Sequence, residues 1–262
     1  MSEQPLIYEV NNGAARLTIH REKQRNSLTP GVIELFMDYL EKADSDESVR
    51  AILITGAGDK AFCAGADLGG AAADEGRRSY QAYAELLKRI AGHAKPTVAR
   101  VNGYCLAGGM GLMMACDIVI ARKDAKFGTP EVNVGLFPMM IGALIFRNVI
   151  RKKAMEMVLL GKKLTADEAL AMGLITRIVP FENLDACVDE VLTALCEKSP
   201  AGLKIGKQAF YHMADLPFEE ALDYLSGKLT EVVSTEDAVE GITAFMEKRK
   251  PVFKGRYEVT WH

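Results

Sequence analysis

The chain has 262 residues, enough for one large domain or for one domain with an appendage. Hydrophobic residues make up 49% of it and charged residues 26%, the balance of a globular protein with a sizeable core. A formal net charge of −3 gives no general electrostatic reason to expect nucleic acid or an anionic membrane as a partner.

The cysteines predict neither a metal site nor a disulfide framework. They form no C-x-x-C pair, have no histidine at ligand spacing, and mostly lie in apolar runs, so we expect reduced, buried thiols. The first nine residues lack the basic start and apolar stretch of a signal peptide, and no apolar run is long enough to span a bilayer. These patterns predict a cytoplasmic protein. The five cysteines are Cys63, Cys105, Cys116, Cys187 and Cys196.

Short β-branched strands alternate with amphipathic helices in the N-terminal part. Residues 6–10 and 15–20 resemble paired strands joined by the turn at 11–13 (Asn-Asn-Gly). Thr29 and Pro30 have the features of a helix N-cap and first helical residue. The continuous apolar run at 51–55 is typical of a strand buried on both faces.

The same order of strand, glycine loop and helix then repeats, which predicts a stacked core of ββα units at 1–199. From about residue 186 the spacing of apolar residues is helical, and we expect a separate helical region at 200–262. The repeating elements are expected at 56–70 (loop), 80–91 (helix), 97–101 (strand), 102–109 (loop) and 117–121 (strand), and the later helices at 188–195, 201–213, 219–233 and 235–248.

Two loops rich in small residues are the strongest chemical signal. The first is AFCAGADL at 61–68 and the second is VNGYCLAGGMG at 101–111. Neither fits a dinucleotide or P-loop fingerprint. Small residues let a backbone approach a ligand closely, and a helix beginning near Gly108 would aim N–H groups at it. The two loops could supply two donors to one oxyanion, or they could merely permit tight packing of strands and helices.

Both loops resemble the signature segments of the enoyl-CoA hydratase/isomerase (crotonase) superfamily, and their order and spacing match as well. The similarity covers nearly the whole chain. Further matching segments are RNSL at 25–28, CDIVIA at 116–121, FGTPE at 127–131, GKKLTADEA at 161–169, GLI at 173–175 and TAFMEKR at 243–249.

The resemblance implies an α/β fold, a spiral of repeated ββα units of the ClpP/crotonase type, with a C-terminal helical region that trimerises. Two trimers often pair into a hexamer in this family. By position, the oxyanion N–H groups fall on Ala66 and Gly108. Coenzyme A would enter as part of the substrate. The positions matched to substrate or coenzyme A binding are Lys23, Gln24, Ala64, Asp67, Leu68, Gly109 and Pro130, and from a neighbouring subunit Phe245 and Lys248.

Proton transfer next to a thioester requires a carboxylate or imidazole within hydrogen-bond reach. Hydratases of this family carry two glutamates, of which this chain keeps one, Glu131, and has Gly111 at the position of the other. A single carboxylate suffices to move a double bond, so we expect Glu131 to be the acid/base. A glutamate at position 111 would face Glu131 across the substrate. The competing interpretation of Glu131 is a helix N-terminal carboxylate that follows Thr129 as N-cap.

Other candidate residues have simpler explanations. Asp67 is expected to fix the first loop, and Asp117 to cap a strand. His93 and His20 fall on no catalytic position and are expected at the surface or in turns, while Tyr104 is expected to pack.

The segment 139–142 (MMIG) departs from the glycine-rich stretch of many hydratases. Its flexible methionines either shape an apolar acyl pocket or pack on a helix face, and both interpretations stay open.

The sequence therefore predicts an enoyl-CoA isomerase or hydratase that needs no metal or redox cofactor. Ala66 and Gly108 would polarise the thioester carbonyl, and Glu131 would move the proton. Hydration by Glu131 alone is the nearest alternative within the superfamily. A catalytically retired acyl-CoA-binding or scaffold oligomer is the alternative of another class.

Overall fold

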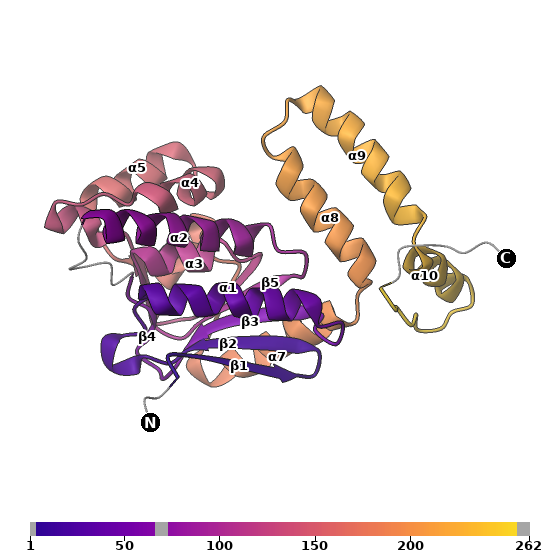
Figure 1. Cartoon of the computed structure of the whole chain (residues 1–262), viewed down its shortest axis with the longest axis horizontal. Coiled ribbons are helices and arrows are strands. Elements are labelled where there is room, and N and C mark those ends of the chain that lie inside the picture. The colour runs from indigo at the N-terminus through magenta and orange to yellow at the C-terminus, as the bar shows by residue number, and fades with distance from the viewer. Residues whose placement is uncertain (1–3, 66–72, 256–262) are drawn as a thin grey trace.

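The computed structural model describes residues 4–65 and 73–255, which form a layered α/β core with a helical arm to one side (Figure 1). The arm consists of α8 (Pro200–Met213), α9 (Phe218–Val233) and α10 (Glu236–Met246). It begins at the residue from which the sequence predicts a helical region. The status of that region as a separate domain stays a prediction.

Two sheets build the core. The larger has the order β1-β2-β3-β5-β7-β10, and only its β1–β2 pair is antiparallel. The smaller has the order β4-β6-β8-β9, with β9 antiparallel. The strands of the larger sheet are β1 (Leu6–Asn11), β2 (Ala14–Ile19), β3 (Ala51–Gly56), β5 (Thr97–Val101), β7 (Ile118–Arg122) and β10 (Arg177–Val179). Those of the smaller sheet are β4 (Ala61–Cys63), β6 (Tyr104–Leu106), β8 (Lys126–Gly128) and β9 (Leu164–Thr165).

From β3 to β8, consecutive strands alternate between the two sheets, which produces the ββα repeat. β3 and β4 precede α2 (Ala73–Ala91), and β5 and β6 precede α3 (Gly108–Met114). β7 and β8 lead through the 3₁₀ helix η2 (Pro130–Val134) to α4 (Met139–Asn148). The stacked ββα order predicted from the sequence is confirmed. Because the smaller sheet pairs β4 with β6 and β6 with β8, the loops that follow these strands are neighbours.

Strand β3 shows why a continuous apolar run was needed here. All six of its residues are buried. Ile52 and Ile54 belong to the main core cluster with α1 (Pro30–Ser45), whereas Leu53 packs in a second cluster with α7 (Leu184–Cys196). Alternate side chains of a strand point to opposite faces, so a strand covered on both sides has to be apolar throughout.

The turn and cap predicted near the N-terminus are confirmed. Asn12 and Gly13 have φ of 50° and 80°, the left-handed pair that a two-residue hairpin turn requires. Thr29 caps α1 by accepting from Val32 N at 3.4 Å, and Pro30 is the first helical residue. The helix expected at 80–91 is longer, because α2 already begins at Ala73.

Asn26 connects the segment before α1 to the first glycine loop. It is fully buried, and its Oδ1 accepts from Arg21 N at 3.1 Å. Its Nδ2 donates to the carbonyls of Ala57 and Ala61, at 3.0 and 2.7 Å. A buried side chain with every polar group bonded holds both segments in one arrangement.

The helical arm exposes large apolar side chains. Within it, α9 buries only one residue, Ala221. Such a surface on a single chain is typical of a protein–protein interface. No described helix is long and apolar enough to cross a membrane. The exposed apolar residues of the arm include Phe210, Phe218, Leu222, Leu229, Val233, Ile242, Phe245 and Met246.

Candidate active site

The two glycine loops touch through their backbones. A Cβ atom on Gly109 would lie 2.2 Å from the carbonyl oxygen of Cys63, closer than any side chain allows. A Cβ on Gly65 would lie 3.1 Å from the Cβ of Ala107 and 3.8 Å from Gly108 N. Glycine at these positions is therefore a requirement of close approach. The interpretation of the loops as packing devices and their interpretation as binding loops are both consistent with this contact.

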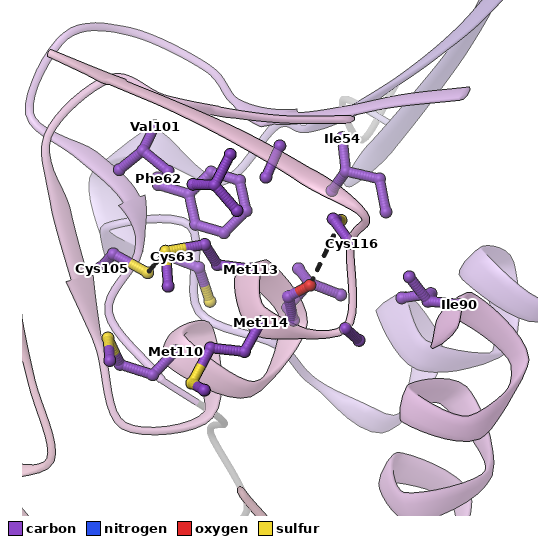
Figure 2. Packing of buried hydrophobic residues seen from close by; sticks show 14 of the residues in the cluster. Ile54, Phe62, Cys63, Ile90, Val101, Cys105, Met110, Met113, Met114 and Cys116 are labelled. Atoms are coloured by element: carbon purple, nitrogen blue, oxygen red, sulfur yellow. Dashed lines mark hydrogen bonds between the residues drawn. The ribbon is translucent and has the colours of Figure 1, made fainter. Parts of the chain in front are cut away.

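A buried layer of sulfur-containing and apolar side chains, here called the sulfur layer, packs in the core next to the two loops (Figure 2). Cys63 and Cys105 face each other in the β4–β6 ladder, and the Cys105 thiol lies 3.8 Å from the sulfur of Met113. Among the described residues all five cysteines are free, and three of them are buried. The expectation of reduced thiols agrees with this arrangement, although Cys187 and Cys196 are only half-buried.

Gly108 is placed as a hydrogen-bond donor by the turn before it. Ala107 has φ 49° and ψ −126°, a conformation that strains a residue with a side chain. Its N–H donates to Gly128 O at 2.9 Å, which holds that conformation. Gly108 then begins α3, and the first N–H groups of a helix have no acceptor within it. The Gly108 N–H is thus available to a ligand.

A cavity of about 600 Å³ lies in front of Gly108, a size suited to a small-molecule site. Glu131 is the only charged residue among those that line it in the described part of the chain. The lining residues are Tyr80, Tyr83, Ala107, Gly108, Glu131, Leu136, Phe137, Pro138, Met139, Met140 and Ile141. Met139 and Met140 line the cavity, and Met140 also packs against the core, so the acyl-pocket interpretation of segment 139–142 stays a prediction that this placement favours.

Glu131 enters the cavity from the first turn of η2, directly after Pro130. Its Oε2 is buried and has no hydrogen-bond partner among the described residues. Burial raises the pKa of Glu131 above its ordinary value, and a hydrogen bond from its own backbone offsets part of this effect. The side chain of Thr129 makes no capping bond, and its buried hydroxyl has no partner in the part of the chain that the structure describes, so the prediction of Thr129 as N-cap is wrong for its side chain.

Tyr83 fills the space beside Gly111. Its hydroxyl donates to Gly108 O at 2.5 Å, and the side chain is 1% exposed. A Cβ on Gly111 would lie 2.2 Å from the Tyr83 hydroxyl oxygen and 2.4 Å from Cγ2 of Ile141. A glutamate at position 111 therefore has no room in this packing. The expectation that it would face Glu131 across the substrate stays a prediction, and it requires Tyr83 and Ile141 to shift first.

The positions matched to coenzyme A fall partly within one region. Lys23 and Gln24 are exposed on the 3₁₀ helix η1 (Glu22–Gln24). Two backbone hydrogen bonds join the segment after them to the first loop, from Ala64 N to Arg25 O at 3.0 Å and from Leu28 N to Gly65 O at 2.9 Å. These bonds bring Lys23, Gln24 and Ala64 to one side of the loop. Ala66, Asp67 and Leu68 lie outside the described residues.

Phe245 and Lys248 are not brought to the cavity by their own chain. Phe245 lies on α10 and is 85% exposed, and Lys248 follows that helix with φ 57°. Figure 1 places α10 at the end of the arm, away from α2, α3 and α4, which carry residues of the cavity lining. A role for these two residues requires a second copy of the chain.

The remaining candidates have structural partners. Asp117 accepts from Thr97 N at 2.7 Å and pairs with Lys207 at 2.8 Å, so it joins β5 and β7 to α8. His93 is buried, not at the surface, and its Nδ1 accepts from the backbone N–H of Lys95 at 3.0 Å in a turn. Tyr104 is 40% exposed, and the Lys163 ammonium lies 5.2 Å from its ring centre, so the ring contact of this residue is one of packing.

Sequence reasoning missed the aromatic residues of the cavity. Tyr80 and Tyr83 lie three residues apart on α2, which puts them on one face of that helix. The helical spacing could have shown this shared face. It could not have shown that the face meets Gly108 and Gly111, because that contact joins separate ββα units.

The chain is similar to proteins of known family. The family model described as enoyl-CoA hydratase/isomerase matches residues 9–256. The short-chain-enoyl-CoA hydratase of Clostridium acetobutylicum is 34% identical over 250 residues, covering 94% of this chain and 95% of that protein. The 2,3-dehydroadipyl-CoA hydratase of Escherichia coli is also 34% identical, over 258 residues that cover 98% and 100% of the two chains. A crystal structure of an enoyl-CoA hydratase from Mycobacterium smegmatis matches with a TM-score of 0.92 at 31% identity, covering 96% and 99%. The fold predicted from the resemblance is confirmed.

The buried carboxylate predicts a pH-dependent effect on stability. A carboxyl group whose pKa is raised on folding opposes folding above its unfolded pKa of about 4.3, and the effect is complete above the folded pKa. We expect Glu131→Gln to raise the free energy of unfolding at pH 8, with a gain that shrinks as the pH falls toward 4. Urea denaturation followed by circular dichroism at several pH values measures it.

Glu182→Gln is the matched control, because Glu182 also lies in the first turn of a 3₁₀ helix but is exposed. It is expected to change stability little at any pH. Equal responses of the two variants would show that burial of Glu131 carries no energetic penalty.

Proposed function

The chain belongs to the enoyl-CoA hydratase/isomerase family, and from this premise we propose that it shifts the double bond of an apolar enoyl-CoA thioester, with Glu131 as the single acid/base. The family is one of acyl-CoA enzymes. The observation that carries the proposal is the pairing of a half-buried carboxylate, whose Oε2 has no hydrogen-bond partner among the described residues, with a filled space at Gly111. Within the described lining, no second acidic residue faces Glu131.

Gly108 N–H would hold the thioester carbonyl oxygen, together with the N–H of Ala66 as the family resemblance implies. Removal of the α-proton places negative charge on that oxygen, and fixed donors stabilise this charge more strongly than the neutral carbonyl. One such donor contributes roughly 3–4 kcal/mol to transition-state stabilisation in well-studied enzymes. Gly109 contributes by its lack of a side chain, which allows the two loops to meet.

Glu131 would then carry the proton between two carbon atoms. Its carboxylate takes the proton from C2 of a β,γ-enoyl thioester, and the electron pair of the broken C–H bond forms a dienolate with its negative charge on the thioester oxygen. When the carboxyl group returns the proton to C4, the carbonyl re-forms and the double bond is left between C2 and C3. The protein ends as it began, and no electron leaves the substrate. Such a sequence requires neither a metal ion nor a redox cofactor, and a carboxylate of raised pKa suits both halves of it.

Hydration is the second candidate, because the relatives from Clostridium acetobutylicum and Escherichia coli are named hydratases. Water addition would use Glu131 as the only carboxylate and would hold the water by backbone groups. Assays of purified protein with β,γ- and α,β-unsaturated acyl-CoAs of equal length separate the candidates. Conversion of the first without water addition to the second supports isomerisation. Failure of both would support an acyl-CoA-binding protein without catalysis.

We expect Glu131→Gln to lower turnover at least a hundredfold, about 2.7 kcal/mol of activation free energy, because glutamine cannot accept the proton. Affinity for a CoA ester should change little, since the binding groups stay in place. Steady-state kinetics and calorimetric titration with a saturated acyl-CoA measure the two effects. Glu182→Gln should match the unmodified protein in both. Near-normal turnover of Glu131→Gln would move the acid/base to another residue, with Asp67 the next to test.

The acyl group that fits this cavity is apolar. Apart from Glu131 its described lining has no charged residue, and residues 66–75 contain no lysine, arginine or histidine. A carboxylate at the far end of the acyl chain would lose its hydration without gaining a cation from the described lining. Aromatic and methionine side chains instead offer an adaptable apolar surface.

We therefore expect kcat/KM to be at least tenfold lower for an enoyl-CoA with a terminal carboxylate than for one of the same length with a terminal methyl group. The methyl ester of the carboxylate substrate is the matched control, because it has similar bulk without the charge. Recovery with the ester supports an electrostatic origin. Equal rates for acid and ester would show that the tail remains in solvent or meets a cation from another subunit.

Binding of the coenzyme A portion is proposed along Lys23, Gln24, Ala64, Asp67 and Leu68, next to Pro130 and Gly109 of the site. Support comes from the hydrogen bonds that join the segment after Gln24 to the first loop. Phe245 and Lys248 would complete this region from a neighbouring copy. The exposed apolar residues of the arm are the observation that favours such an assembly.

Light scattering at micromolar concentration should therefore give the mass of a trimer or a hexamer of the 28.6 kDa chain. Association is expected because burying the apolar faces of α9 and α10 removes them from water. A monomer at that concentration would contradict the assembly and, with it, the roles of Phe245 and Lys248.

A further inference from the structure

The Tyr83 hydroxyl meets three parts of the site at once. It donates to the carbonyl of Gly108, and it occupies the space that the Cβ of a side chain at position 111 would need. It also lies close enough to Glu131 for the charge of that carboxylate to add to burial in raising the pKa of Tyr83. Burial, with smaller contributions from nearby acidic groups that include Glu131, keeps the pKa of this hydroxyl well above its usual value. It is thus a neutral donor whose proton is already committed to Gly108.

The bond to Gly108 O bears on the oxyanion donor of the same residue. The N–H and the carbonyl of Gly108 belong to two peptide planes that meet at a Cα without a side chain, so glycine alone does not fix the angle between them. On one side, the plane of the Gly108 N–H also contains the Ala107 carbonyl, which accepts from Met110 N at 2.8 Å. On the other side, Tyr83 holds the plane that contains the Gly108 carbonyl. The direction of the Gly108 N–H is therefore constrained from both ends.

We propose that Tyr83 is a positioning residue of this enzyme, whose hydroxyl fixes the Gly108 oxyanion donor from the place that a second carboxylate would otherwise take. The proposal rests on the function assigned to Gly108 above. It explains in one contact why position 111 is glycine: any side chain there displaces the hydroxyl. The donor at Gly108 and the absence of a carboxylate at position 111 are consequences of the same packing.

Tyr83→Phe tests the proposal, because it removes the hydroxyl and keeps the ring that fills the core. We expect kcat to fall about tenfold, with less than a twofold change in KM and an unchanged acid limb of the pH profile, since Glu131 is untouched. Tyr8→Phe is the matched control, because the Tyr8 hydroxyl is also buried but has no hydrogen-bond partner among the described residues. A Tyr83→Phe variant with kcat within twofold of the unmodified protein would overturn the proposal.

A double-mutant cycle separates positioning from general packing. Gly111→Ala places a methyl group against the Tyr83 hydroxyl oxygen and should lower kcat by breaking the bond to Gly108. In the Tyr83→Phe background that bond is already absent, so Gly111→Ala should lower kcat by less than twofold further. Multiplicative losses in the double variant would contradict the proposal. If Gly111→Ala does not fold, the kcat of Tyr83→Phe decides alone.

The proposed function and this inference are contradicted by different experimental results. The unmodified protein, assayed with both enoyl-CoA isomers, decides the reaction. The Tyr83 variants are then compared in whichever reaction it catalyses. Loss of kcat at constant KM supports the positioning role for hydration as well as for isomerisation, because both require the oxyanion donor. An unmodified protein inactive on both substrates would overturn the function and the inference together.

Discussion

The contact between the backbone of Gly109 and the carbonyl of Cys63 is the constraint on which the site depends. At the 2.2 Å separation that a Cβ would have from that oxygen, no other residue fits without moving a strand or a helix. The contact joins two consecutive ββα units at the ends of neighbouring strands, β4 and β6. It sets the distance between the two loops and therefore the place of Gly108 relative to any ligand. The cavity and Glu131, which comes from the third unit, are arranged around that fixed point.

Two local features of the site reduce the free energy of unfolding, and the packing of the surrounding structure maintains both. Ala107 has a strained backbone, a conformation that costs about 1–3 kcal/mol. Glu131 has a buried oxygen without a partner. The parallel sheet and its two apolar clusters supply the stability that maintains them, because β3 is buried on both faces and every polar group of Asn26 is bonded. Backbone strain and a buried carboxylate oxygen that has no partner among the described residues, close together in an otherwise well-satisfied fold, are typical of functional sites.

Local patterns in the sequence predicted the elements, and the family resemblance predicted their spiral order. The apolar run of β3, the Asn12–Gly13 turn and the Thr29 cap each depend on neighbours within a few residues, so the sequence alone revealed them. Glu131 and Gly108 were found through matched motifs, and both line the cavity. Tyr83 was not found, because its partners Gly108 and Gly111 are 25 and more residues away and only packing between units brings them together. Thr129 shows the opposite error: a residue type that favours capping stands at the cap position, but its side chain makes no capping hydrogen bond.

The sulfur layer beneath the loops has a consequence for chemical labelling. Burial raises the pKa of the Cys63 thiol to about 12 and that of Cys105 well above its usual value, so neither is a thiolate at neutral pH. Thiolates are the species that alkylating reagents attack. Both thiols are therefore protected as long as β4 and β6 remain paired, and their alkylation requires the ladder to separate. The rate at which a maleimide modifies these two cysteines would thus report how often the β4–β6 ladder opens in the native protein.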